Sequence, residues 1–130
     1  MEKYCKLISI EAATLVDMVQ HSILHAASRY EGVLCQTILQ KKQALPHADC
    51  RVETALAESI LTLNGELLDD TVALKTALET APETDGEHML HYYHDTIFAQ
   101  MNKVRASIDK LETLVAGDYW PYPRYTDLLF

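Results

Sequence analysis

Apolar side chains recur every three or four residues through three long stretches of this sequence, and that spacing constrains the fold more than any other feature. Residues three or four apart lie on one face of an α-helix, so each stretch predicts one amphipathic helix. The first runs from about Glu2 to about Leu45, and Gly32 inside it is expected to weaken the helix locally. Its apolar positions are Tyr4, Leu7, Ile8, Leu15, Met18, Val19, Ile23, Ala27, Tyr30, Leu34 and Ile38.

The second stretch begins after a break around Pro46, because proline cannot continue a helix. Asp49 is the expected N-cap of the helix that follows. Asn64 and Gly65 together are a turn signal, but the apolar spacing continues across them in phase, so we predict one helix through the pair. Its apolar positions are Val52, Leu56, Ile60, Leu63, Leu67, Leu74 and Leu78.

A third stretch follows a second break around Pro82. Thr84 and Glu87 have the spacing of a capping box, and Gly117 is the expected terminator. Glycine and proline number only four each, which favours helix throughout. The apolar positions of this stretch are Met89, Tyr93, Ile97, Met101, Val104, Ile108, Leu111 and Val115.

Short connections between consecutive helices favour antiparallel neighbours. Helices of about 30 residues span roughly 45 Å each, so the molecule should be long and narrow. We therefore expect an all-α fold, an elongated antiparallel up-down-up three-helix bundle, with residues 1–130 forming a single helical domain.

The last segment, residues 118–130, breaks the helical pattern. Five of its residues are aromatic, and two prolines favour an extended path. Disordered tails are poor in aromatic residues, so this aromatic and proline-rich tail is expected to dock, either on its own bundle or on a neighbouring domain or subunit. The residues expected to dock are Trp120, Pro121, Tyr122, Pro123, Tyr125, Leu128, Leu129 and Phe130.

Composition excludes several classes of partner. A formal net charge of −8 disfavours nucleic acid and anionic membrane surfaces. No apolar run is expected to span a bilayer, and the mixed charges at the N-terminus are unlike a signal peptide. Cys5, Cys35 and Cys50 lack paired spacing, so we interpret them as reduced thiols, with those on apolar faces packed in the core of a cytoplasmic protein.

Six histidines raise the question of a metal site. Glu87, His91 and Asp95 share a helix face, near His88 and His94; His21 and His25 form another pair four residues apart. The second helix has no histidine to complete such a site, so a solvated polar face is the favoured interpretation. The sequence also lacks a glycine-rich phosphate loop, so we predict no catalytic, cofactor-binding or metal-binding residue in this chain.

Two segments resemble a known family. The tail contains a tryptophan, two alternating prolines, a tyrosine, an acidic residue and a terminal Leu-Leu-Phe, and it resembles the extreme C-terminus of type III glutamine synthetases. His25 stands where that family is expected to have proline and Thr126 where it has glycine, which weakens a kink and a turn as inherited features. The start of the family's final helical region is similar to the opening of this chain, Met1-Glu2-Lys3-Tyr4-Cys5-Lys6 with Ile10, Glu11, Ala12 and Thr14.

The resemblance implies that the chain is the C-terminal fragment of a larger ligase, which makes glutamine from glutamate, ammonia and ATP with Mg or Mn. Its implied partners are the parent's upstream catalytic domain and further copies in a homo-oligomer. The chain itself would hold no cofactor, and its role would be structural, in domain packing or oligomer assembly within cytoplasmic nitrogen metabolism.

An independent helical protein-interaction module remains the alternative. The length of the gene separates the two: a reading frame extending several hundred residues upstream of Met1 favours the ligase, and a stop codon just upstream favours the module.

Overall fold

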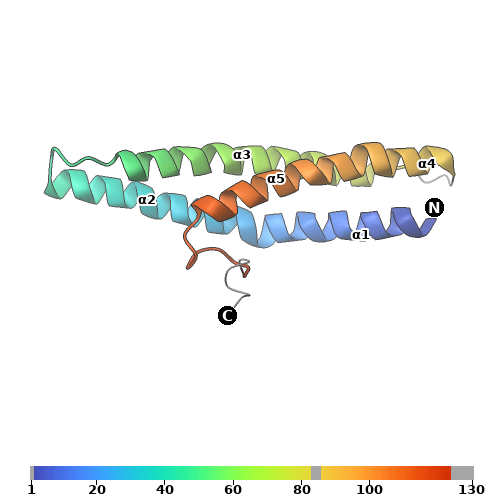
Figure 1. The fold of residues 1–130 in the computed structure, drawn as a ribbon, viewed down its shortest axis with the longest axis horizontal. Coiled ribbons are helices and arrows are strands. Elements are labelled where there is room, and N and C mark those ends of the chain that lie inside the picture. The colour runs from blue at the N-terminus through green and yellow to red at the C-terminus, as the bar shows by residue number, and fades with distance from the viewer. Residues whose placement is uncertain (1, 83–85, 124–130) are drawn as a thin grey trace.

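The computed structural model describes residues 2–82 and 86–123 of the chain. Within those ranges the secondary structure is helical, without strands, and it forms three long helical rods (Figure 1). The connections between rods lie around Pro46 and Pro82. The prediction of an all-α chain with three helical stretches is therefore confirmed.

The first rod comprises α1 (Glu2–Met18), the π-helix η1 (Val19–Ile23) and α2 (Leu24–Ala44). It runs the length of the molecule in Figure 1, from the N-terminus to the connection at the opposite end. Gly32 lies inside α2 without interrupting it, so the predicted weakness is not at the glycine. The departure from α-helical geometry lies at η1 instead, which ends two residues before His25.

The second rod is α3 (Arg51–Glu79), one unbroken helix that returns along the first rod (Figure 1). Its continuity confirms the prediction that the helix runs through Asn64 and Gly65. The side-chain Nδ2 of Asn64 donates to the carbonyl oxygen of Leu24 at 3.2 Å. Asn64 therefore joins α3 to the start of α2 instead of forming a turn.

The third rod comprises α4 (Glu87–Tyr92), the π-helix η2 (Tyr93–Ile97) and α5 (Phe98–Leu114). In Figure 1 it runs back alongside α3 and ends before reaching the α2–α3 connection. Both α3 and α1 contact η2, and α3 also packs against α1, α2 and α5.

The two π-helices follow from the spacing of the buried residues. Each of them coincides with a run of four-residue steps, whereas an α-helix turns once in 3.6 residues, so every such step rotates the apolar stripe by about 40°. A π-turn takes up the additional residue and keeps the stripe facing the core. The runs are Leu15, Val19, Ile23 and Ala27 in the first rod, and Met89, Tyr93, Ile97 and Met101 in the third.

Two predicted helix ends need correction. The N-cap of α3 is Cys50, and Asp49 lies one residue earlier, where its Oδ1 accepts the backbone N–H of Arg51 at 3.1 Å. At the end of the third rod, α5 stops at Leu114. The extended backbone of Val115 terminates the helix before Gly117 is reached.

The predicted capping box at the start of the third rod is also wrong. The N-cap of α4 is Gly86, whose φ of 107° lies in the region that favours glycine. Glu87 is therefore the first helical residue, whereas a capping box would need it in the third position. Thr84 lies outside the described residues.

The core is formed mainly by the predicted apolar stripes, with two exceptions. Leu7 is exposed, and Val52 is 66% exposed because its neighbour Glu53 takes the inward position at the start of α3. Thr71 occupies another buried position of α3. The largest completely buried side chains are Ile23, Ile60, Leu67, Leu74, Ile97, Met101 and Leu111.

The first rod corrects one further expectation, that no apolar run is long enough to cross a bilayer. Between Glu2 and Ala44 the helix contains a window that is long and apolar enough by length and composition alone. Core helices of soluble proteins meet the same criterion, and 33% of that window is buried inside the protein. Val19 and Ile23, in the middle of the rod, are fully buried in the core.

Candidate functional site

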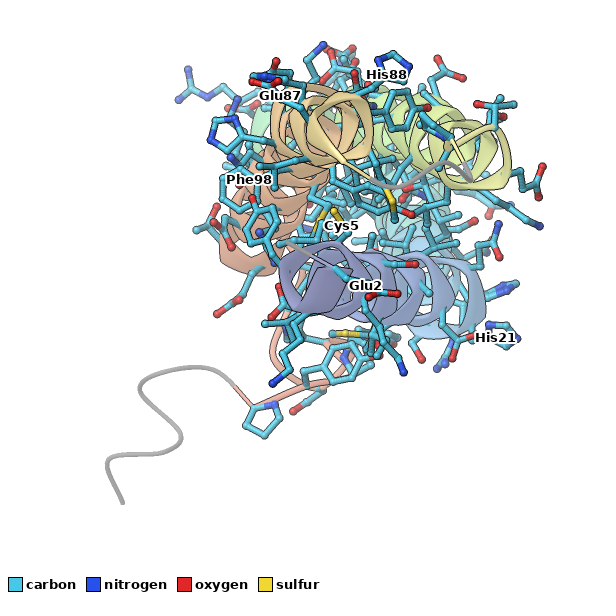
Figure 2. The ribbon with its side chains drawn as sticks, turned by 90° about the vertical axis from the view of Figure 1, so that its right-hand side faces the viewer. Glu2, Cys5, His21, Glu87, His88 and Phe98 are labelled. Atoms are coloured by element: carbon cyan, nitrogen blue, oxygen red, sulfur yellow. The ribbon has the colours of Figure 1, made fainter. Side chains whose placement is uncertain are left out.

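The histidine-rich face of the third rod lies in solvent. His91 Nε2 lies 3.7 Å from Glu87 Oε1, and its Nδ1 lies 3.9 Å from Asp95 Oδ2. His94 Nδ1 is 2.9 Å from Asp95 Oδ1. All four side chains are mostly exposed, and Figure 2 shows Glu87 and His88 at the outer edge of the molecule. These are weak surface ion pairs that form when the histidine is protonated.

The other histidine pair is equally exposed. His21 Nδ1 lies 3.1 Å from Asp17 Oδ1, and both His21 and His25 are exposed. Among the residues that the structure describes, no group of three histidine, cysteine or acidic side chains is arranged to hold a metal ion. Glu87, His91 and Asp95 do lie near one another on one helix face, as the sequence predicts. Their side chains do not point at a common position, which a metal site requires.

The resemblance to glutamine synthetases raises the question of whether the described residues could bind the phosphate groups of ATP. Phosphate binding calls for a glycine-rich loop, or clustered backbone N–H groups at a helix start. Gly32 and Gly65 lie inside helices, Gly86 precedes a helix of six residues, and Gly117 lies in the turn after α5. The glycines of the described residues therefore form no glycine-rich phosphate loop.

The start of the tail packs against the bundle. Backbone N–H groups of Tyr119 and Trp120 donate to the carbonyl oxygen of Ala116 at 2.9 and 3.2 Å, which turns the chain after α5. The Tyr119 ring lies 5.3 Å from the Tyr30 ring of α2, with the Arg29 guanidinium 5.6 Å from its centroid. Residues 118–120 thus carry the chain from α5 to α2.

Trp120 is only 7% exposed and belongs to the hydrophobic core. Tyr122 is half-buried against the same core, while Pro121 and Pro123 are exposed. The other residues expected to dock lie outside the described residues: Tyr125, Leu128, Leu129 and Phe130.

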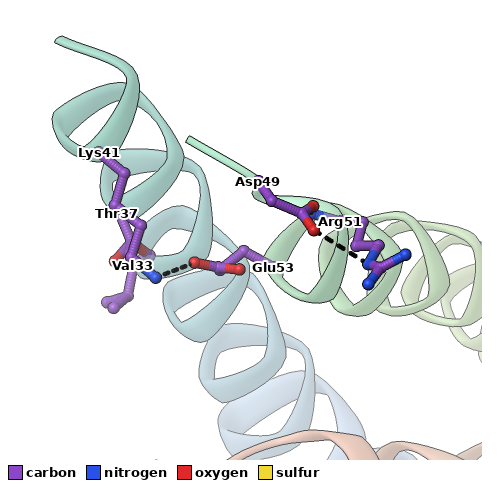
Figure 3. A network of polar contacts seen from close by, with 6 residues as sticks. All are labelled: Val33, Thr37, Lys41, Asp49, Arg51 and Glu53. Atoms are coloured by element: carbon purple, nitrogen blue, oxygen red, sulfur yellow. Dashed lines mark hydrogen bonds and ion pairs between the residues drawn. The ribbon is translucent and has the colours of Figure 1, made fainter. Parts of the chain in front are cut away.

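The α2–α3 connection is closed by a polar network that sequence reasoning missed (Figure 3). The Lys41 ammonium donates to the Glu53 carboxylate, whose side chain is only 12% exposed. This hydrogen bond raises the pKa of Lys41 above its ordinary 10.5 and lowers the pKa of Glu53 below its ordinary 4.5. Asp49 and Arg51 form an exposed ion pair beside it, at 3.1 Å. These two ion pairs stabilise the α2–α3 connection. Their four charged groups are paired with one another, so we assign them no chemical role.

Two grooves flank α3. The larger, of about 480 Å³, lies between α3 and α5 and is lined by residues that include Glu58, Thr62 and Lys110. The smaller, of about 210 Å³, lies between α2 and α3. It is lined by Glu31, Cys35, Ile38, Thr54, Ala57, Glu58 and Leu61. We call this smaller groove the α2–α3 groove. Cys5 and Cys50 are buried as free thiols, whereas Cys35 is exposed in this groove.

The surface chemistry does not indicate a function, and comparison with known proteins gives further evidence. Residues 1–42 match the family profile described as the glutamine synthetase C-terminal domain. No solved structure matches the chain.

Relatives match the chain along essentially its whole length. A glutamine synthetase from Butyrivibrio fibrisolvens is 31% identical, covering 100% of this chain and 19% of the relative. A type-3 glutamine synthetase from Dictyostelium discoideum is 26% identical over 99% of this chain and 18% of the relative. A glutamine synthetase from Bacteroides fragilis is 24% identical over 100% of this chain and 18% of the relative. The chain thus spans about a fifth of the length of these relatives, and essentially all of it is similar to glutamine synthetases, a type-3 enzyme among them.

Proposed function

We propose that this chain is a non-catalytic structural domain from the C-terminal part of a larger type III glutamine synthetase. The observation that carries the proposal is the match in length: essentially all of this chain aligns with glutamine synthetases, yet it accounts for only 18–19% of them. The remaining four-fifths would contain the catalytic domain. The parent would make glutamine from glutamate, ammonia and ATP in cytoplasmic nitrogen metabolism.

The chemistry of the described residues supports a role without catalysis. Phosphoryl transfer requires positioned cations and donors around the phosphate groups. The metal-ligand residue types in the described part of the chain form no group able to hold an ion. ATP and its Mg or Mn would therefore be bound by the rest of the parent.

The arrangement of the rods supports a structural role. As proposed, residues 1–130 form one antiparallel up-down-up bundle, and residues 118–130 form a tail docked on it. The burial of Trp120 and the packing of Tyr119 against Tyr30 support this docking. The bundle's partners would be the parent's own catalytic domain and other copies in a homo-oligomer, and three free cysteines suit a cytoplasmic location.

A γ-glutamyl transfer assay with manganese tests the absence of catalysis. The isolated chain is expected to show no turnover above a heat-denatured sample, and turnover above it would overturn the proposal. Co-expression with the parent's remaining residues is expected to give a stable complex that survives purification. A chain that remains separate under those conditions would argue for the independent interaction module, which the open α2–α3 groove also suits.

A further inference from the structure

A second apolar stripe runs along α3 on a surface that the bundle leaves uncovered. Leu61, Leu68 and Val72 are 61%, 48% and 51% exposed. With Gly65 they occupy consecutive positions at alternating steps of four and three residues, so they form one continuous strip of the helix surface. We call these four residues the α3 stripe.

Gly65 has no explanation within the chain itself. Glycine in the middle of a helix weakens it relative to alanine. The backbone at Gly65 does not have positive φ, and nothing lies within 4 Å of the position that a Cβ would occupy. A missing side chain does, however, lower the surface of the stripe and lets another helix approach closely.

The α3 stripe is complementary to itself when a second copy is laid on it in the opposite direction. If the symmetry axis passes between Glu66 and Leu67, Leu61 faces Val72 of the second copy. The bare Gly65 then faces Leu68 of the second copy, so a large side chain meets the gap. A twofold contact requires this self-complementarity, in which the same patch serves both partners.

The charges at the two ends of the stripe follow the same symmetry. Glu58 and Lys75 are both exposed, and each lies three residues beyond the apolar part of the stripe. The antiparallel arrangement therefore places Glu58 level with Lys75 of the second copy at both ends. In a chain of net charge −8, this pairing of opposite charges offsets part of the repulsion between copies.

The α2–α3 groove lies beside the Glu58 end of the stripe and suits a lysine. Its lining is mostly apolar, from residues such as Ile38 and Ala57, while Glu31 and Glu58 supply carboxylates. A lysine side chain combines an apolar stem with a charged head, so it fills an apolar groove and meets carboxylates with its ammonium. In the antiparallel arrangement, Lys75 of the second copy lies level with this groove.

From these observations we infer that the α3 stripe is a homodimer surface, on which α3 of two copies packs antiparallel with Lys75 of each directed at the α2–α3 groove of the other. The inference deepens the assembly role under the proposed function by giving it a surface and a geometry. It rests on the exposure, spacing and charge of residues in α2 and α3.

Sedimentation equilibrium of the 130-residue chain across a concentration series tests the dimer. The wild type is expected to show the mass of two chains at high concentration, and Leu68→Glu the mass of one. Leu39→Glu is the matched control, because Leu39 is 66% exposed on α2 outside the stripe, and it should leave the dimer unchanged. A monomeric wild type, or a Leu68→Glu protein that dimerises equally well, would overturn the inference. Circular dichroism establishes that each variant remains helical.

Charge reversal tests the antiparallel geometry. Glu58→Lys and Lys75→Glu should each weaken the dimer by about tenfold or more, and the double variant should regain most of the affinity because the pair is restored in reverse. A double variant that remains as weak as the singles would contradict the proposed pairing. No catalytic domain takes part in these measurements. A monomeric result thus leaves the proposed function standing, and turnover by the isolated chain would leave the dimer standing.

Discussion

At the end of the molecule that carries α4, three helical rods pack against one another, whereas the opposite end consists of the α2–α3 hairpin alone (Figure 1). At the first end, Tyr93 and Ile97 of η2 are buried between α1 and α3. At the hairpin end, Leu39, Leu45 and Val52 are largely exposed. Two helices cannot enclose the apolar surface that three helices enclose, so the two ends depend on different interactions.

The hairpin end is held by a polar contact in place of a closed core. Glu53 takes the inward position that Val52 was expected to fill, and Lys41 donates to its carboxylate. Helix pairs with little buried surface open more readily than closed cores. The packed end should therefore set the global stability, and the hairpin end should open locally.

The largest expected effect is the loss of Trp120, which extends the core beyond the end of α5. Trp120→Ala should lower the free energy of unfolding by ~3–5 kcal/mol, because it leaves a cavity where a buried ring was. A chain ending at Gly117 should be destabilised similarly. Thermal melts measure both, and melting at the temperature of the full-length chain would show that the tail lies outside the cooperative core.

Substitutions at the two ends should differ sharply. Ile97→Ala at the packed end should cost ~2–5 kcal/mol, because Ile97 is fully buried. Leu39→Ala at the hairpin end should change stability by no more than about 0.5 kcal/mol. Urea unfolding of the two variants decides the matter, and equal losses would mean that the hairpin end is as tightly closed as the other.

A change of pH should open the hairpin end alone. Because the pKa of Glu53 is lowered, its contribution is present above its ordinary 4.5 and is lost as pH falls through the folded value. Because the pKa of Lys41 is raised, its contribution is present below 10.5 and is lost as pH rises through the folded value.

Amide hydrogen exchange near Glu53 should therefore speed up at both extremes, relative to the intrinsic rate. Glu53→Gln should remove the acid limb, whereas Asp49→Asn, in the exposed pair with Arg51, should leave it in place. An unchanged acid limb in Glu53→Gln would show that the ion pair does not hold this end.

The smallest effect should have the opposite sign. Gly65→Ala lies on α3, which spans both ends, and a Cβ there meets nothing within 4 Å. At concentrations where the chain is monomeric, it should gain about 0.5–1 kcal/mol through helix propensity. Thermal melts of dilute protein measure the gain, and a loss would reveal a contact at this position within one chain.

Most of the fold could be predicted from the sequence, because its determinants are local. The apolar spacing and the two prolines predict the three helical stretches and their breaks, and phase continuity predicts the passage through Asn64 and Gly65. The helix ends were less predictable, since Asp49, Glu87 and Gly117 each lie one to three residues from the position that their residue type prefers. A run of four-residue steps between apolar residues marks both η1 and η2 in the sequence. Such steps also occur in ordinary α-helices, so the sequence alone did not predict the two π-helices.

The sequence by itself determined where helices form and which resemblance the chain carries. The tertiary structure alone decided which apolar residues face inward. Along α3, Ile60, Leu67 and Leu74 form one stripe and Leu61, Leu68 and Val72 form another, and both satisfy helical spacing. Only the positions of the other two rods bury the first and leave the second in solvent. Periodicity defines faces of a helix, whereas burial depends on neighbours that are distant in the sequence.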